Sequence, residues 1–484
     1  MSGPWHDDVM ADHALDIAAI PQLNGMFAPV HDEIDADDLT VTQGAIPDDL
    51  VGTYLRNGPN PRFDPIGSYT YPLDGDGMVH GVWFEGGTAR YRNRFVETPT
   101  LQAEEQAGRA LWGGVMDMFH PSADLVGPEL AGKDKDLPDV HIVRHAGRYL
   151  ALAESAPPFE LTDELATVGE HDFGPGLSKG ICAHPKVDPV TGEMVVFRYD
   201  FSEPFLAWGV VAADGSVARP EEVIDLDSGY MIHDFVITER HLVLFVGPLN
   251  FDIAAAMTGG SVLAWKPELG MRIAVIDRTT PAGTTAAVQW IHTDAFWVWH
   301  FANAFETTAA DGSVTITVDY PDWSHPGMGL VAEPSTGGVC RARLDLAAGT
   351  IAIERVATGY SEFPRIDDRL AGREHRWFHL AGKDQDHAAV AGEWNSLVRY
   401  DMRTGTSTTR NMGATCVGEA IFVPRAGSTG EDDGYVLTYA YDLAADATSL
   451  LVLHAADIAG EPVATIATPQ RVPFGLHGSW IAAD

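Results

Sequence analysis

The chain has 484 residues, of which 45% are hydrophobic, and its formal net charge at pH 7 is −38. This length is more than twice that of an ordinary domain, so we expect either two fused domains or a fold that grows by repetition. The acidic balance disfavours nucleic acid and anionic membranes as partners, because the field of the protein would repel both.

Targeting signals and cysteine motifs give little further direction. The first residues are acidic where a signal peptide needs basic ones, and no run of about 18 uncharged apolar residues occurs, so no membrane-spanning helix is expected. Cys182, Cys340 and Cys416 are widely spaced, which argues against a disulfide framework or a thiolate metal site. We expect a cytoplasmic protein.

Strand–turn–strand patterns recur along most of the chain. In the first of them a Gly86-Gly87 turn separates two runs of strand-forming residues. Hairpins of this kind are predicted, in chain order, at residues 77–95, 141–154, 187–201, 231–247, 339–355, 394–411 and 435–454.

Helical patterns are sparse: the best candidates are residues 98–112 and 160–168, and a short turn of helix is predicted at residues 252–258. Many hairpins with few helices predict an all-β protein, and a β-propeller more than a sandwich or a TIM barrel. We expect an N-terminal arm over residues 1–25 and a single propeller domain over residues 26–484.

Four of the 19 histidines stand in apolar, motif-like surroundings: His184, His233, His300 and His477. They are too far apart in sequence to share a helix face or a zinc loop. Strands from different blades of a propeller converge on one axis, so these side chains can meet there. Four neutral imidazoles would bind a borderline divalent metal and leave one or two positions open.

Three glutamates lie within apolar strand patterns, where an unpaired charge would be costly: Glu154, Glu362 and Glu419. A histidine that binds a metal needs its second ring nitrogen held by another group, most often a carboxylate. We therefore predict that the three glutamates orient the histidines. The sequence does not indicate which glutamate supports which histidine.

The motifs around these residues resemble the carotenoid cleavage oxygenase family. The matching stretches run in the family's order from near residue 26 to the end of the chain: YLRNGPNP, DGDGMVHG, YRNRFVET, ALAES, AHPKVDPVTGEM, MIHDF, WHFANAFE, EFPRI, GEAIFVPR and PFGLHGSW. One such motif would be weak evidence, whereas ten in sequence are strong evidence.

The resemblance implies a seven-bladed β-propeller with a helical and loop dome over an axial iron site. It places His184, His233, His300 and His477 at the four positions that bind Fe(2+), and the three glutamates behind them. It also implies a non-haem dioxygenase that uses O2 to cleave a conjugated C=C bond of a carotenoid or apocarotenoid into two carbonyl products. The expected partners are O2 and a small apolar substrate, with weak membrane contact at most.

Three positions depart from patterns seen in the family. Val140 stands where a threonine near the open side of the metal is common. Stilbene-cleaving members have tyrosine and lysine at the positions of Phe95 and Ala153, and neither residue here can bond a phenol. Phe95 is instead our candidate for an aromatic wall against the substrate.

Other functions remain open on the sequence alone. Within the family, the chain is a candidate for cleaving a stilbene or phenylpropene. A propeller lactonase or other hydrolase would need carboxylates converging on the axis, whereas the apolar motifs here centre on histidine. A non-catalytic binding propeller would not need four histidines with three buried glutamates.

Overall fold

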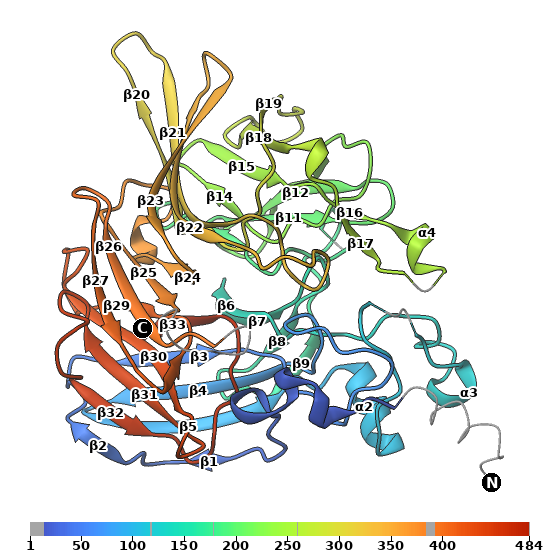
Figure 1. The fold of residues 1–484 in the computed structure, drawn as a ribbon, viewed down its shortest axis with the longest axis vertical. Helices are drawn as coiled ribbons and strands as arrows, with labels where there is room; N and C mark the ends of the chain where they lie inside the picture. The colour runs from blue at the N-terminus through green and yellow to red at the C-terminus, as the bar shows by residue number, and fades with distance from the viewer. Residues whose placement is uncertain (1–13, 117–118, 178, 259, 384–392, 484) are drawn as a thin grey trace.

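The computed structural model describes residues 14–116, 119–177, 179–258, 260–383 and 393–483. Its strands form seven antiparallel blades around a ring, with one further two-stranded hairpin (Figure 1). The fold is therefore an all-β, seven-bladed propeller, as predicted. Every hairpin expected from the sequence is present as a pair of adjacent strands within a blade.

The first four blades come mainly from the first 293 residues. In spatial order, blade 1 contains β1 (Asp35–Ala36), β5 (Thr88–Phe95), β4 (Met78–Glu85), β3 (Gly52–Arg56) and β33 (Gly478–Ala482). Blade 2 contains β6 (His141–His145), β7 (Arg148–Leu152), β8 (Phe159–Leu161) and β9 (Thr167–Glu170). Blade 3 contains β10 (Lys186–Val187), β11 (Met194–Tyr199), β12 (Leu206–Val211) and β13 (Val217–Val223). Blade 4 contains β14 (Phe235–Ile237), β15 (His241–Val246), β18 (Met271–Asp277) and β19 (Val288–Thr293).

The last three blades follow in chain order. Blade 5 contains β20 (Asn303–Thr308), β21 (Val314–Trp323), β22 (Gly337–Asp345) and β23 (Thr350–Thr358). Blade 6 contains β24 (Ser361–Arg365), β25 (Trp377–Gly382), β26 (Ser396–Asp401) and β27 (Thr406–Asn411). Blade 7 contains β2 (Val41–Gly44), β32 (Ala464–Ala467), β31 (Ala447–His454) and β30 (Gly434–Asp442), with both β28 (Thr415–Val417) and β29 (Ile421–Pro424) paired to β30.

The ring closes at two blades that combine strands from both ends of the chain. Strand β33 pairs with β3, so that Gly478 lies opposite Arg56. Strand β2 pairs with β32 at the outer edge of blade 7. Because each end of the chain completes a blade begun by the other, the ring has no free junction between its first and last blades.

Packing of blade against blade explains why the strands are apolar on both faces. All residues of β11 and β15 are buried, as expected for strands covered on two sides. The outer strand β27 is mostly exposed and rich in threonine. The core therefore lies between neighbouring blades, and the inner strands are held rigidly around the axis.

Helices and one hairpin lie on the right of the view in Figure 1. They are α2 (Pro99–Ala107), α3 (Ala123–Val126), α4 (Ile253–Ala256) and the hairpin of β16 (Leu249–Phe251) and β17 (Leu263–Trp265). Short 3-10 turns occur at Ile17–Ala19, Pro21–Leu23, Gly25–Phe27, Pro267–Leu269 and Asp368–Leu370. Among the described helices, none is long and apolar enough to cross a membrane.

Two of the three helix predictions are confirmed. Helix α2 begins after Thr98, whose side chain accepts a hydrogen bond from the Leu101 amide, and it ends before Gly108 in the left-handed conformation. Helix α4 falls within residues 252–258. The prediction for residues 160–168 is wrong, because that segment forms β8, a turn and β9, with Phe159 and Leu161 buried on one face.

The N-terminal arm predicted over residues 1–25 is only partly described. Residues 1–13 lie outside the described residues. From residue 14 onward the segment forms 3-10 turns, and the side chains of Leu23, Met26 and Phe27 are buried. The arm therefore joins the core by residue 23.

Candidate metal centre

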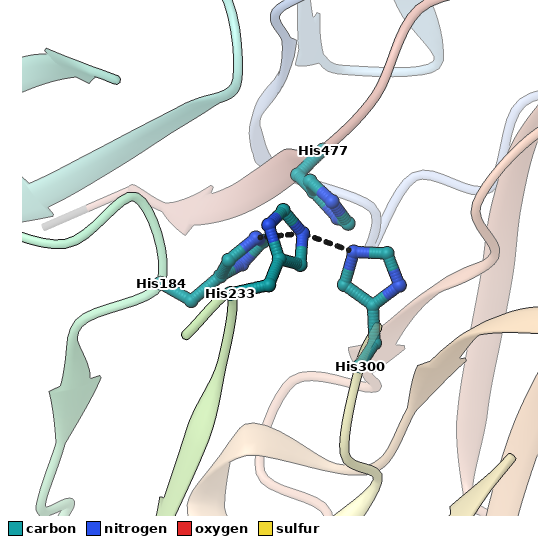
Figure 2. A group of neighbouring side chains, drawn as sticks. All are labelled: His184, His233, His300 and His477. Carbon is teal, nitrogen blue, oxygen red and sulfur yellow. Dashed lines mark hydrogen bonds between the residues drawn. The ribbon is translucent and has the colours of Figure 1, made fainter. Parts of the chain in front are cut away.

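The four predicted histidines occupy equivalent places in four blades. His184, His233, His300 and His477 lie just before β10, β14, β20 and β33, which are the inner strands of blades 3, 4, 5 and 1. The inner strands surround the axis, so the segments that lead into them converge there. Figure 2 shows the four rings pointing toward one another from separate segments.

The spacing of the ring nitrogens fits a single metal ion. The Nε2 atom of His233 lies 3.1 Å from Nε2 of His184 and 3.1 Å from Nε2 of His300. One nitrogen from each of the four histidines lies within 4.8 Å of all the others. Two nitrogens bound about 2.1 Å from one ion, at a right angle, would be about 3 Å apart.

Three of the histidines contact the three predicted glutamates, one each. Glu154 Oε1 lies 2.5 Å from His233 Nδ1, and Glu362 Oε2 lies 2.7 Å from His300 Nδ1. Glu419 Oε1 lies 3.0 Å from His477 Nδ1. Among the described residues, no carboxylate forms an ion pair with His184, so the fourth histidine is supported differently from the other three.

These contacts determine where the imidazole protons lie. A carboxylate next to Nδ1 places the proton on that nitrogen, which leaves the Nε2 lone pair facing inward. Burial lowers the pKa of His300 to about 3 and lowers the pKa values of His184 and His477 well below their usual range. Neutral imidazoles with converging lone pairs repel one another. A metal cation between them would remove this repulsion, because each lone pair would bind the cation.

The pKa values of Glu362 and His233 also fit a cation at the centre of the cluster. Burial raises the pKa of Glu362 to about 8, and a positive ion nearby would hold this carboxyl ionised. Burial alone would lower the pKa of His233, but the Glu154 carboxylate raises it above its usual value.

Each glutamate is held in turn by a different kind of donor. The hydroxyl of Tyr199 donates to Glu154 Oε2 at 3.0 Å. The indole Nε1 of Trp323 donates to Glu362 Oε1. Nη1 of Arg365 donates to Glu419 Oε1 at 3.2 Å, and the Gly478 amide donates to Oε2 of the same carboxylate at 2.8 Å. The glutamates are therefore oriented on both of their oxygens.

A cavity of about 530 Å³ lies beside Glu154, and we call it the apolar cavity after its aliphatic and aromatic lining residues. Asp134, Lys135, Asp136, Asp139 and Asp200 also line it. Its wall includes Val140 and Ala153, two of the positions that depart from the family patterns. The other residues used below are Tyr199, Phe201, Met231, Phe251 and Leu263, which also line it. Phe251 and Leu263 belong to the β16–β17 hairpin, so this hairpin covers part of the cavity.

A second cavity of about 320 Å³, which we call the polar cavity, is lined by His184, His300 and His477 themselves. Charged side chains border it, among them Lys186, Asp234 and Arg365. Nζ of Lys186 lies 2.7 Å from Asp234 Oδ1. Three of the four histidines therefore line the polar cavity, whereas the apolar cavity reaches the cluster through Glu154, which contacts His233.

Phe95 is not brought to either cavity. It lies on β5 opposite Met78 on β4, and it packs with Met78 and Leu101 in a small buried cluster. The guanidinium of Arg62 lies 5.1 Å from its ring centroid. The aromatic residues that line the apolar cavity are instead Tyr199, Phe201 and Phe251, together with Trp112 and Phe119.

Comparisons with known proteins show the family of this chain. The family described as retinal pigment epithelial membrane protein (RPE65) matches residues 27–482. A carotenoid cleavage oxygenase of Mycobacterium tuberculosis is 33% identical over 95% of this chain and 97% of that protein. The chain belongs to the carotenoid cleavage oxygenase family.

Solved structures of carotenoid cleavage oxygenase relatives share the propeller. The lignostilbene dioxygenase of Pseudomonas brassicacearum is 29% identical with a TM-score of 0.88, covering 96% of this chain and 99% of that one. The apocarotenoid oxygenase of Synechocystis is 26% identical with a TM-score of 0.82, covering 94% and 97%. The names of these two relatives give different substrates, a lignostilbene and an apocarotenoid, so family membership alone does not determine the substrate.

The residues that hold the glutamates were not predicted from the sequence. Arg365 stands within the EFPRI motif that pointed to Glu362, yet it serves Glu419 on another blade. Tyr199 and Trp323 lie at the ends of ordinary aromatic strand patterns, β11 and β21. A tyrosine that ends a buried strand next to an aspartate was the only signal for Tyr199, and it is a weak one.

Proposed function

We propose that the protein is an iron(II) dioxygenase that cleaves a conjugated C=C bond of a carotenoid or apocarotenoid to give two carbonyl products. The observation that carries the proposal is the group of four converging histidines, three of them held by buried glutamates, beside an apolar cavity. Imidazole nitrogen suits divalent iron, and an all-histidine set differs from thiolate zinc sites.

Each residue has a defined part in this proposal. His184, His233, His300 and His477 would hold Fe(2+), and Glu154, Glu362 and Glu419 would keep three imidazoles in the orientation and tautomer that binding needs. The bound iron would supply the redox chemistry that allows O2 to react with an alkene. The cavity wall would hold the alkene beside the metal and exclude water, and none of the protein groups needs to transfer a proton.

The apolar cavity favours a polyene substrate. Val140, Ala153, Met231 and Phe251 offer no hydrogen-bond donor, and a polar group buried against them would lose its hydration without a partner. Aromatic side chains such as Phe201 and Phe251 would stabilise positive charge that develops along a polyene during the reaction. The hairpin that covers the cavity is nearly uncharged, which fits an apolar substrate entering there.

A stilbene or phenylpropene is the second candidate substrate. The similarity to a lignostilbene dioxygenase, at a TM-score of 0.88, favours it. Against it stands Ala153, which lines the cavity and has no group that bonds a phenol. The substrate of highest kcat/KM will decide between these two classes.

An anaerobic reconstitution tests the proposal. The protein is loaded with iron(II), supplied with an apocarotenal or with resveratrol, and then exposed to 18O-labelled O2. A dioxygenase places one labelled oxygen in each of the two carbonyl products, which are reduced at once to alcohols to prevent exchange with water. The proposal is wrong if the iron-loaded protein cleaves neither class, or if product forms equally without iron.

A further inference from the structure

A line of contacts connects the apolar cavity to one of the histidines. Tyr199 lines this cavity, and its hydroxyl donates to Glu154 Oε2 at 3.0 Å. The other oxygen of the same carboxylate, Oε1, lies 2.5 Å from His233 Nδ1. A side chain that lines the apolar cavity therefore holds the carboxylate that orients His233.

Tyr199 is itself fixed from several sides. It ends strand β11, its backbone amide donates to Ser155 Oγ at 3.1 Å, and its side chain is 8% exposed. Its ring stacks on Phe251 of the β16–β17 hairpin, with centroids 6.0 Å apart and planes 28° apart. Movement of that hairpin would therefore displace the Tyr199 ring.

The hydroxyl acts as a donor in this arrangement. Burial raises the pKa of Tyr199 well above its usual value, and the Glu154 carboxylate raises it further. The phenol therefore keeps its proton, and that proton can only stabilise an oxygen acceptor such as Glu154. A protonated phenol adds no charge of its own to the cavity wall.

The other two side-chain donors lack this double role. Trp323 borders neither cavity, and Arg365 borders the polar cavity. Of the three, Tyr199 alone contacts both the apolar cavity and a glutamate of the histidine cluster.

We propose that Tyr199 is a positioning residue, which fixes Glu154 and through it His233, and so ties the geometry of the metal to the wall of the apolar cavity. This inference rests on the metal centre of the proposed function. It assigns Tyr199 no contact with the metal and no step in bond cleavage.

Cobalt(II) binding tests the inference without requiring activity. Cobalt(II) has visible absorption bands that depend on its ligands, so both affinity, by chelator competition, and ligand geometry are measurable. Tyr199→Phe removes only the hydroxyl, and losing its hydrogen bond to the Glu154 carboxylate should weaken cobalt binding about fivefold and shift the bands. The matched control is Tyr435→Phe, because Tyr435 is 2% exposed and its hydroxyl donates to Asp49 at 2.9 Å, outside the cluster of four histidines.

A double-mutant cycle with Glu154→Ala shows whether Tyr199 acts through that carboxylate. If it does, adding Tyr199→Phe to Glu154→Ala should cause almost no further loss of cobalt affinity. Additive losses, or a Tyr199→Phe protein with wild-type affinity and spectrum, would overturn the inference. Failure of the wild-type protein to bind cobalt(II) or iron(II) would instead overturn the proposed function, so the two failures are distinguishable.

Discussion

The two cavities beside the histidine cluster differ in the side-chain donors that they supply to its glutamates. The apolar cavity is bordered by Val140, Ala153 and Met231, and the donor it contributes is a neutral phenol. The polar cavity is bordered by Lys186 paired with Asp234 and by Arg365 paired with Glu419. The two share none of the residues that line them.

This difference separates two tasks that would conflict in one place. A charged side chain stabilises a buried carboxylate strongly. Next to a bound apolar ligand the same charge would weaken binding, because the charge must lose water when the ligand binds. With the guanidinium on the polar side, Glu419 gains a charged partner, whereas the glutamate beside the apolar cavity, Glu154, has a neutral phenol as its donor. Four changes test the histidine cluster and the two cavities, and their expected effects decrease in the order given below.

The largest effect should come from the histidine whose ring nitrogen is central to the cluster. His233→Ala removes the Nε2 atom that lies 3.1 Å from two others, so we expect loss of most bound iron and of all turnover. Metal analysis after anaerobic loading measures this. His241→Ala is the control, because His241 also pairs with a glutamate, Glu306, but lies outside the cluster. Full iron occupancy in His233→Ala would contradict the assignment.

Removing the charge from the polar side should cost stability. Arg365→Met leaves Glu419, whose side chain is 1% exposed, without its charged partner, and we expect the free energy of unfolding to fall by about 3 kcal/mol. Chemical denaturation measures the change. The exposed pair Arg343–Glu354 provides the control, since Arg343→Met should cost less than about 1 kcal/mol. Equal losses in the two variants would show that Glu419 does not depend on Arg365.

Glu362 borders neither cavity. Its replacement therefore tests only the contact by which it orients His300. Glu362→Gln should keep the fold and weaken metal affinity or activity about 10–100-fold, because the amide is a weaker acceptor for the His300 Nδ1 proton. Iron titration measures the affinity. Glu306→Gln, which changes a contact of the same 2.7 Å length to His241, should leave iron binding unchanged. Wild-type iron content and turnover in Glu362→Gln would mark it as an ordinary structural residue.

We expect the smallest effect from a substitution that adds a charged group to the apolar cavity. Ala153→Lys introduces an ammonium group that can bond a phenol, so the ratio of kcat/KM for resveratrol to that for an apocarotenal should rise about tenfold. Phe95→Tyr alone should leave this ratio unchanged, since Phe95 packs with Met78 outside the cavity. A wild-type preference for resveratrol would show that other residues supply the phenol contact.

The sequence predicted those parts of the molecule that depend on local patterns. Paired strands around short turns indicated hairpins, and motifs indicated the histidines and glutamates. Closure by β2 and β33 joins opposite ends of the chain, and no local pattern predicts such pairing. The error at residues 160–168 has a related origin, because alternating burial of Phe159 and Leu161 arises only when β8 lies against a neighbouring strand.

The site was predicted as a set of residues but not as a set of contacts. Which glutamate meets which histidine depends on how neighbouring blades are rotated, and that is a property of the whole ring. Phe95 was misplaced for a similar reason, because the face of β5 on which it lies is set by pairing with Met78. Resemblance to a family supplies positions in a sequence, whereas the distances that decide a role come from packing.

The position of His477 ties the histidine cluster to the assembly of the ring. It immediately precedes β33, and β33 reaches its place only by pairing with β3 from the other end of the chain. During synthesis, His184, His233 and His300 emerge from the ribosome long before it does, so a nascent chain holds an incomplete cluster. Uptake of the ion would thus follow closure of the propeller, and it would stabilise the closed ring against reopening at the junction of β3 and β33.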